Sequence, residues 1–156
     1  MDLIVGENTY MSLDEANEII NSRYRSNNNI KKIWTELNDE DKTITILSVT
    51  ERFDNRYMFY KGDKLSKDQK LQFPRVINNM TFECPFSIKH GLLLQAIREI
   101  EDEQSEEIQL KNKGVKSFAD GTGAKIDFET TTKNKNQLDM YSDIWNKYFS
   151  EWSLLV

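Results

Sequence analysis

Apolar and polar residues alternate at helical spacing through the first quarter of the chain. Ser12-Leu-Asp-Glu15 is a capping box, in which the Ser12 hydroxyl accepts from the Glu15 amide and the Glu15 carboxylate reaches back. Met11, just before the box, is placed to staple against Ala16. The polar cluster 26–29 ends this first predicted helix. A second, short helix is predicted from apolar residues at Ile30, Ile33, Trp34 and Leu37.

The next segment fits either a helix or a strand. Residues 38–41 supply a cap and first-turn acids for a helix, but residues 43–50 are rich in β-branched Thr, Ile and Val, which favour strands. The continuation favours a helix of about four turns, because one face is extended at helical spacing. Its apolar members are Ile46, Val49, Phe53 and Tyr57.

A further helix is predicted to begin at Cys84-Pro85, with proline at its first position, and to run to about Gln104. It carries Ile88, Leu92, Ala96 and Ile100 at four-residue steps. His90 lies on this helix without the partners of a catalytic pattern, so a structural or surface role is favoured. For Cys84 we favour a role at the helix start over that of a reactive thiol.

The last part of the chain changes pattern. Asp120-Gly-Thr-Gly123 separates two short alternating runs and predicts a β-hairpin at about 114–128. A polar linker, 130–136, precedes a predicted helix over 137–156. That helix has an aromatic seam formed by Leu138, Tyr141, Trp145, Tyr148, Trp152 and Leu155. Such a stripe is more often core than binding surface, but Trp and Tyr are also the residues enriched at interface hot spots, so both interpretations stay open.

Together these segments predict a mainly α fold, a small helical bundle of about four to five helices with a β-hairpin insertion and a separate C-terminal helix. We expect one helical domain over residues 1–129, followed by the linker and the C-terminal helix.

Composition narrows the function classes. The 156 residues carry a net charge of -5, which argues against a surface that grips nucleic acid everywhere. Local lysine clusters remain, in the central loop and before the hairpin. The single cysteine suggests a reducing compartment, and no leader or membrane span is expected. We find no pattern of a catalytic, metal or cofactor site and expect no enzyme.

The most specified part of the chain is its centre. An aromatic run, Tyr57-Met-Phe-Tyr60, is stopped by Gly62, and a polar spacer leads to Gln69-Lys-Leu-Gln-Phe-Pro-Arg75. No regular element requires these residues in this order. Loops with such specification usually have a function.

With Thr9-Tyr10, Ser12-Leu13 and the Lys61-Gly62 pair, this element resembles the head-to-tail connector (adaptor) proteins of tailed bacteriophages, a family sometimes labelled DnaT-like after a primosomal single-strand DNA-binding protein. The resemblance covers residues 9 to 128. Its most specific element is Gln-x-Leu-x-aromatic-Pro-Arg, where the family usually has Trp and this chain has Phe73. Cys84-Pro85 stands where the family has Ile-Pro, and the family's C-terminus is usually shorter and less aromatic.

The resemblance implies a structural virion protein, without cofactor, that forms a ring between portal and tail and extends the DNA channel. Its expected partners are the portal protein, the next neck or tail-completion protein and copies of itself, commonly as a dodecamer, with double-stranded DNA as passing cargo and no membrane. Its place would be the virion neck, assembled in the cytoplasm of the bacterial host. We expect Arg75 to pair with a carboxylate of its own or an adjacent subunit. The expected interface residues are Gln69, Phe73, Arg75, Lys116, Phe118, Tyr141, Trp145, Tyr148, Trp152 and Leu155.

Two other functions remain open. The first is a single-stranded DNA-binding module that uses the central lysines, with Tyr57, Phe59 and Tyr60 as stacking surfaces. The second is an unrelated helical interaction protein.

Overall fold

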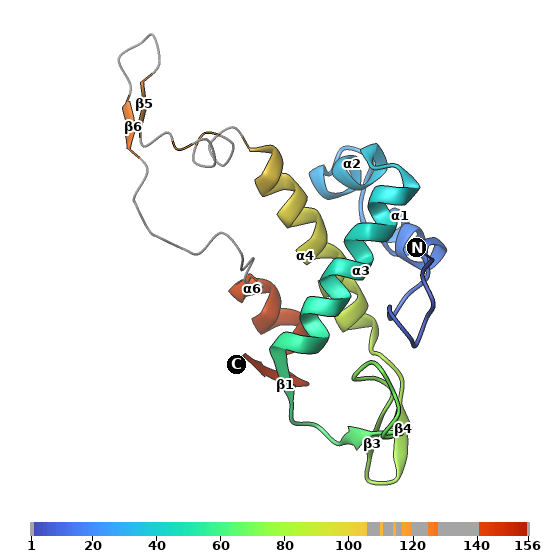
Figure 1. Ribbon diagram of the computed structural model, residues 1–156. Coiled ribbons are helices and arrows are strands. Elements are labelled where there is room, and N and C mark those ends of the chain that lie inside the picture. The colour runs from blue at the N-terminus through green and yellow to red at the C-terminus, as the bar shows by residue number, and fades with distance from the viewer. Residues whose placement is uncertain are drawn as a thin grey trace. The chain divides into compact units, whose positions relative to one another are not determined.

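The computed structural model describes residues 2–105, 110, 114, 117–119, 125–127 and 141–155. The fold is mainly helical, as predicted (Figure 1). The long helices are α1 (Leu13–Arg23), α2 (Asn29–Glu36), α3 (Asp39–Arg56) and α4 (Phe86–Gln104). A short helical piece near the C-terminus consists of α6 (Ser142–Ile144) and the π-helical turn η1 (Trp145–Phe149). No helix in the described ranges is long and apolar enough to cross a membrane.

Three small antiparallel sheets accompany the helices. In the first, β1 (Tyr57–Phe59) pairs with β7 (Ser153–Leu155). In the second, β2 (Asp63–Lys64), β3 (Arg75–Ile77) and β4 (Met80–Phe82) lie in that order. The third is the predicted hairpin, formed by β5 (Ser117–Ala119) and β6 (Lys125–Asp127).

The chain divides into two compact units. The first contains residues 1–97 and 140–156, and the second contains residues 98–139. The C-terminal residues therefore belong to the same unit as the N-terminal helices. The expected linker, 130–136, lies outside the described residues.

The ambiguous segment is helical. Residues 43–50 lie inside α3, and the apolar face predicted from the continuation is buried, with Ile46, Val49 and Phe53 almost fully enclosed. Burial of a continuous stripe outweighs the modest strand preference of β-branched residues. The helix ends at Arg56, so Tyr57 begins β1 instead of extending the helix.

The helix starts follow the predicted signals with one difference. The Ser12 hydroxyl accepts from the Glu15 amide over 3.1 Å. The Glu15 carboxylate, however, accepts from Lys89 on α4 over 2.7 Å, so only half of the capping box forms and the other half becomes an inter-helix ion pair. Pro85 directly precedes α4, and its carbonyl accepts from the Ile88 and Lys89 amides.

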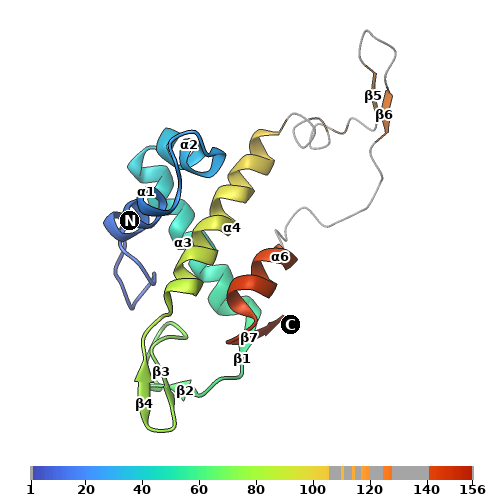
Figure 2. The same ribbon diagram turned by 180° about the vertical axis from the view of Figure 1, so that it is seen from behind.

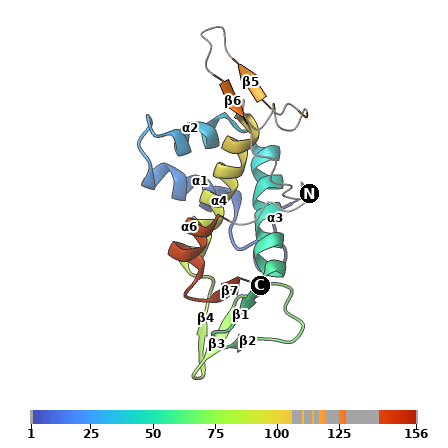
Figure 3. The same ribbon diagram turned by 90° about the vertical axis from the view of Figure 1, so that its left-hand side faces the viewer.

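The core of the first unit lies between α1, α3 and α4. Figures 1 and 2 show α1 and α2 on one side of the α3–α4 pair and α6 on the other. The small sheet β2–β3–β4 lies beyond the end of α3 and the start of α4, where β1 and β7 also meet (Figure 3). The α4 side of this core is formed by Ile88, Leu92, Leu93, Ala96 and Ile97.

The predicted C-terminal helix over 137–156 is wrong from residue 150 onward, and its first residues, 137–140, lie outside the described residues. Helical structure stops at Phe149, and the chain turns at residues 150–152 into β7. Leu155 is therefore a strand residue paired with Tyr57. The reason is tertiary, because the end of the helix brings residues 153–155 beside the unpaired edge of β1.

Candidate functional site

The Gln69–Arg75 element directs alternate residues inward. Leu71, Phe73 and Arg75 are 6%, 2% and 5% exposed, whereas Gln72 and Pro74 between them are half-buried. The Gln69 side-chain amide donates to the carbonyls of Leu71 and Pro74 over 2.8 and 2.9 Å and holds the bend from inside. The motif is thus a bent stretch whose signature side chains Leu71, Phe73 and Arg75 are buried in the protein.

Arg75 joins the two arms of the central segment. Its Nε donates to the Lys61 carbonyl over 2.7 Å, one Nη donates to the Gly62 carbonyl, and the other donates to Gln72 Oε1 over 3.0 Å. We expected a carboxylate partner, but the hydrogen bonds of this guanidinium within the described part of the chain go to carbonyl and amide oxygens. Burial lowers the pKa of Arg75, against the opposing effect of Asp63 nearby.

Gly62 makes this arrangement possible. Its φ of 69° is in the left-handed region, and a Cβ there would collide with the Val76 carbonyl of β3. The glycine that ends the aromatic run therefore lets the chain pass close to β3, where its carbonyl meets Arg75.

A second group of hydrogen bonds surrounds Tyr10, whose ring packs on Phe73. The Tyr10 hydroxyl donates to Asp54 Oδ1, and the Gln72 amide donates to the Tyr10 oxygen over 3.1 Å. Burial raises the pKa of both Tyr10 and Asp54. The N-terminal Thr9-Tyr10 motif, α3 and the central element are thereby tied at one point.

Phe73 is the centre of an aromatic cluster. Its ring centroid lies 5.9 Å from that of Tyr10, 5.8 Å from Phe59 and 5.0 Å from Trp152, each in an edge-to-face arrangement. Such pairs contribute about 0.5–1.5 kcal/mol each beyond their buried area. The aromatic position before Pro-Arg is therefore a packing centre of the unit.

The C-terminal segment, residues 141–155, covers this cluster. Phe149 packs on Phe53 at 4.8 Å between centroids, and Trp152 packs on Phe73. Close approach of the segment to α4 depends on Gly91, because a Cβ there would lie 2.6 Å from Tyr148 Cβ and 2.8 Å from Phe149 Cε1. Gly91, which sequence reasoning passed over, is thus the contact point of two elements distant in sequence.

Residues 150–152 of the C-terminal segment make polar contacts with the central segment. The Tyr60 hydroxyl donates to the carbonyls of Ser150 and Glu151 over 2.9 and 2.7 Å. Lys61 forms a 2.8 Å ion pair with Glu151, and its ammonium also lies 4.9 Å from the centre of the Trp152 ring. Two residues of the predicted nucleic-acid loop are thereby engaged by the chain itself.

Two further central lysines and one of the aromatics also have partners in the chain. Lys70 forms a 2.8 Å ion pair with Glu7, and Lys64 donates to the Gln69 carbonyl over 3.2 Å. Phe59 packs between Phe53 and Phe73 instead of presenting a stacking face. Single-strand binding through this loop would require these contacts to be rearranged.

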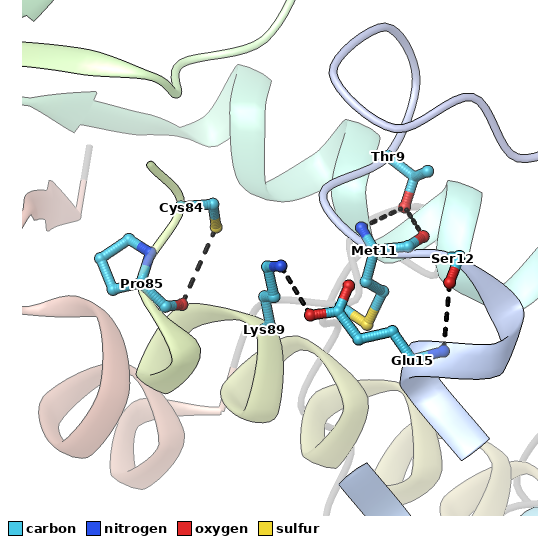
Figure 4. Close-up of polar contacts among 7 residues, drawn as sticks. All are labelled: Thr9, Met11, Ser12, Glu15, Cys84, Pro85 and Lys89. Carbon is cyan, nitrogen blue, oxygen red and sulfur yellow. Dashed lines mark hydrogen bonds and ion pairs between the residues drawn. The ribbon is translucent and has the colours of Figure 1, made fainter. Parts of the chain in front are cut away.

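Cys84 and His90, the two other residues with reactive side chains that the sequence singled out, both have contacts within the chain. Cys84 lies just before α4 (Figure 4), and burial raises the pKa of its thiol, which opposes the reactive thiolate form. His90 Nε2 lies 2.7 Å from the Tyr24 hydroxyl, and its ring packs against Tyr148 at 5.3 Å. This histidine joins α1, α4 and η1. Across the described residues, no group of His, Cys, Asp and Glu is arranged to hold a metal ion.

The expected interface residues thus fall into three groups. Phe73, Arg75 and Trp152 are buried in their own chain. Tyr141, Trp145 and Tyr148 are half-buried in the C-terminal segment, and Gln69 is half-buried in the central element. Phe118 and Leu155 occupy strands β5 and β7, and Lys116 lies outside the described residues.

The geometry defines a small helical domain whose central element and C-terminal segment pack on each other. Comparison with family models matches residues 2–136 to the family described as "Putative DnaT-like ssDNA binding protein", so the chain belongs to this family. A search of curated proteins and a search of solved structures each found no match to the chain.

Proposed function

We propose that this chain is a structural subunit of a phage head-to-tail connector, a ring between portal and tail through which double-stranded DNA passes. In this role it is a virion neck protein, not an enzyme. Its partners are the portal protein, the next neck or tail-completion protein and further copies of itself.

The observation that carries this proposal is the use of the central element inside the chain. Arg75 bonds to the carbonyls of Lys61 and Gly62, and Lys61 and Lys70 are paired with Glu151 and Glu7. A loop built this way holds a fixed shape and offers little free positive charge. That suits a subunit contact better than a grip on a phosphate backbone.

Exposed apolar side chains around the small sheet support an assembly role. Tyr60, Leu65 and Met80 are 51%, 53% and 58% exposed. Met80 directly follows the β3–β4 turn, in which Asn78 and Asn79 have positive φ. A net charge of -5 also suits a conduit through which DNA slides without sticking.

The test is association with the portal protein of the same phage. The purified chain is mixed with portal rings and analysed by sedimentation, beside a Leu65→Glu, Met80→Glu variant. We expect wild type to co-sediment with the portal or with its own rings, and the variant to remain free with an unchanged circular dichroism spectrum. A wild-type chain that stays monomeric with the portal and with the adjoining neck protein would contradict the proposal.

Single-stranded DNA binding is the second candidate, and the family description is what favours it. Lys67 is exposed, and the ion pairs of Lys61 and Lys70 involve side chains that are themselves partly or largely exposed, so salt or DNA could displace them. Under this function a labelled oligonucleotide binds at low salt, and affinity falls steeply as salt is added.

Two charge-reversal variants distinguish the connector function from single-stranded DNA binding. Lys67→Glu with Lys70→Glu removes binding if the central loop holds DNA, whereas Lys31→Glu with Lys32→Glu on α2 is the matched control with the same change in net charge. The connector proposal expects no measurable binding by any of these proteins at low salt.

A further inference from the structure

We propose that neighbouring copies of this chain exchange their C-terminal segments, so that residues 141–155 of one copy cover the aromatic cluster of the next. This inference deepens the proposed function, on which it rests, and names the contact that joins subunits. Within a single chain the segment lies over its own aromatic cluster, and between copies it makes the same contacts in the neighbour.

The segment contacts the rest of the first unit at several points, although among the described residues the buried indole Nε1 of Trp145 has no hydrogen-bond partner. Ile144, Phe149 and Trp152 are buried, and Phe149 packs on Phe53 while Trp152 packs on Phe73. The Tyr141 amide donates to Gln95 Oε1 at one end of the segment, and β7 pairs with β1 at the other. Burial of three large apolar side chains gives this interface a substantial hydrophobic driving force.

Without residues 141–155, the surface on which they pack, here called the receiving surface, is apolar. Phe53, Phe59 and Phe73 contact Phe149 or Trp152 or lie beside them, and β1 would be left as an unpaired edge. An exposed edge strand beside an aromatic patch is a ready acceptor for a segment of the same kind. A second copy of this chain carries that segment.

The connection is long enough for exchange. The segment is joined to α4 through residues 106–140, and a chain of that length spans on the order of 100 Å when fully extended. A domain of this size has a radius of gyration of about 13 Å. Even with the β5–β6 hairpin included, the connection allows the segment to reach an adjacent copy.

Exchange of an identical element between protomers costs little, because the interactions that break within a chain form again between chains. Head-to-tail exchange gives a ring when the rotation between copies closes and an open filament when it does not; the proposed function requires the ring.

The β1–β7 register provides the experiment. Met58 and Leu154 are paired across the two strands, and Met58 adjoins Phe59, which occupies the core side of β1. Met58→Cys and Leu154→Cys are made in separately tagged chains and together in one chain. The wild-type chain, with Cys84 alone, controls for unrelated cross-links.

The single-cysteine chains are co-expressed, assembled and oxidised. Exchange predicts disulfide-linked dimers carrying both tags, and it predicts that the double-cysteine chain shifts from linked single chains to linked multimers on assembly. The inference is overturned if the double-cysteine chain forms only disulfides within one chain and the co-expressed single-cysteine chains form no linked dimers. Tyr57→Cys with Leu155→Cys, the neighbouring pair, repeats the test if the first pair does not fold.

Failure of this inference is distinguishable from failure of the proposed function. Rings containing only chains linked to themselves would remove segment exchange and leave the connector function intact. Chains linked to each other in assemblies without a fixed ring symmetry would support exchange and contradict the connector.

Discussion

Trp152 packs edge-to-face on Phe73, with 5.0 Å between ring centroids, although the two residues are far apart in the sequence. Phe73 is part of the motif that carries the family resemblance, and Trp152 lies beyond the family match. The contact links the shared element of the chain to its C-terminal segment. Segment exchange between copies depends on this packing.

Replacement of Trp152 by alanine should destabilise the chain by about 3–5 kcal/mol, because a buried ring that packs on Phe73 and Phe82 is removed. Urea unfolding followed by circular dichroism measures the change. Trp152→Phe, which keeps an aromatic ring, should cost clearly less. Equal stability of the alanine variant and wild type would show that the segment does not cover the cluster.

Gly91→Ala should also lower the folding stability of the chain. Alanine is favoured over glycine inside a helix by about 1 kcal/mol. The added Cβ, however, would lie 2.6 Å from Tyr148 Cβ, which is fixed to the backbone, and overpacking of this kind costs about 1–3 kcal/mol. Hydrogen exchange should therefore show faster exchange in residues 142–149, whereas a more stable variant with unchanged exchange would contradict the close approach.

Arg75→Lys should lose most of the folding stability that Arg75→Ala loses. Lysine keeps the charge but cannot donate to the carbonyls of Lys61 and Gly62 from one planar group. A buried carbonyl left without its donor costs about 1–3 kcal/mol. Thermal unfolding of both variants checks this, and a lysine variant as stable as wild type would show that charge alone is required.

The pH dependence of stability should reveal Asp54. Its raised pKa means that the folded state holds a proton that the unfolded state has already released. The stability of wild type relative to Asp54→Asn should therefore fall as pH rises above the ordinary carboxyl pKa, and level off above the raised value. Urea unfolding of both proteins between acidic and neutral pH measures the difference, and a constant difference would contradict the burial of this carboxyl.

Local signals were enough to predict α1, α2, α3 and α4, but not the end of the C-terminal helix. Ser12 and Glu15 marked the start of α1, and the spacing of Ile46, Val49 and Phe53 decided between helix and strand for α3. The turn glycines marked the β5–β6 hairpin. These features depend on residues close in sequence, so the sequence contains the information directly.

What the sequence did not reveal depends on distant partners. Residues 57–59 and 153–155 are each too short to be recognised as strands, and they become strands because they pair with each other. Arg75 was expected to find a carboxylate, because nothing local shows that Gly62 turns its carbonyl toward it. The role of Gly91 was invisible for the same reason, since its neighbours Tyr148 and Phe149 arrive from the chain end.

Electron microscopy of the purified chain together with the portal protein of the same phage tests the central claim most directly. The connector function predicts rings of one fixed rotational symmetry, with this chain forming a layer on the portal and an open channel through both. Portal rings that never acquire this layer, from a chain that binds single-stranded oligonucleotides instead, would contradict it.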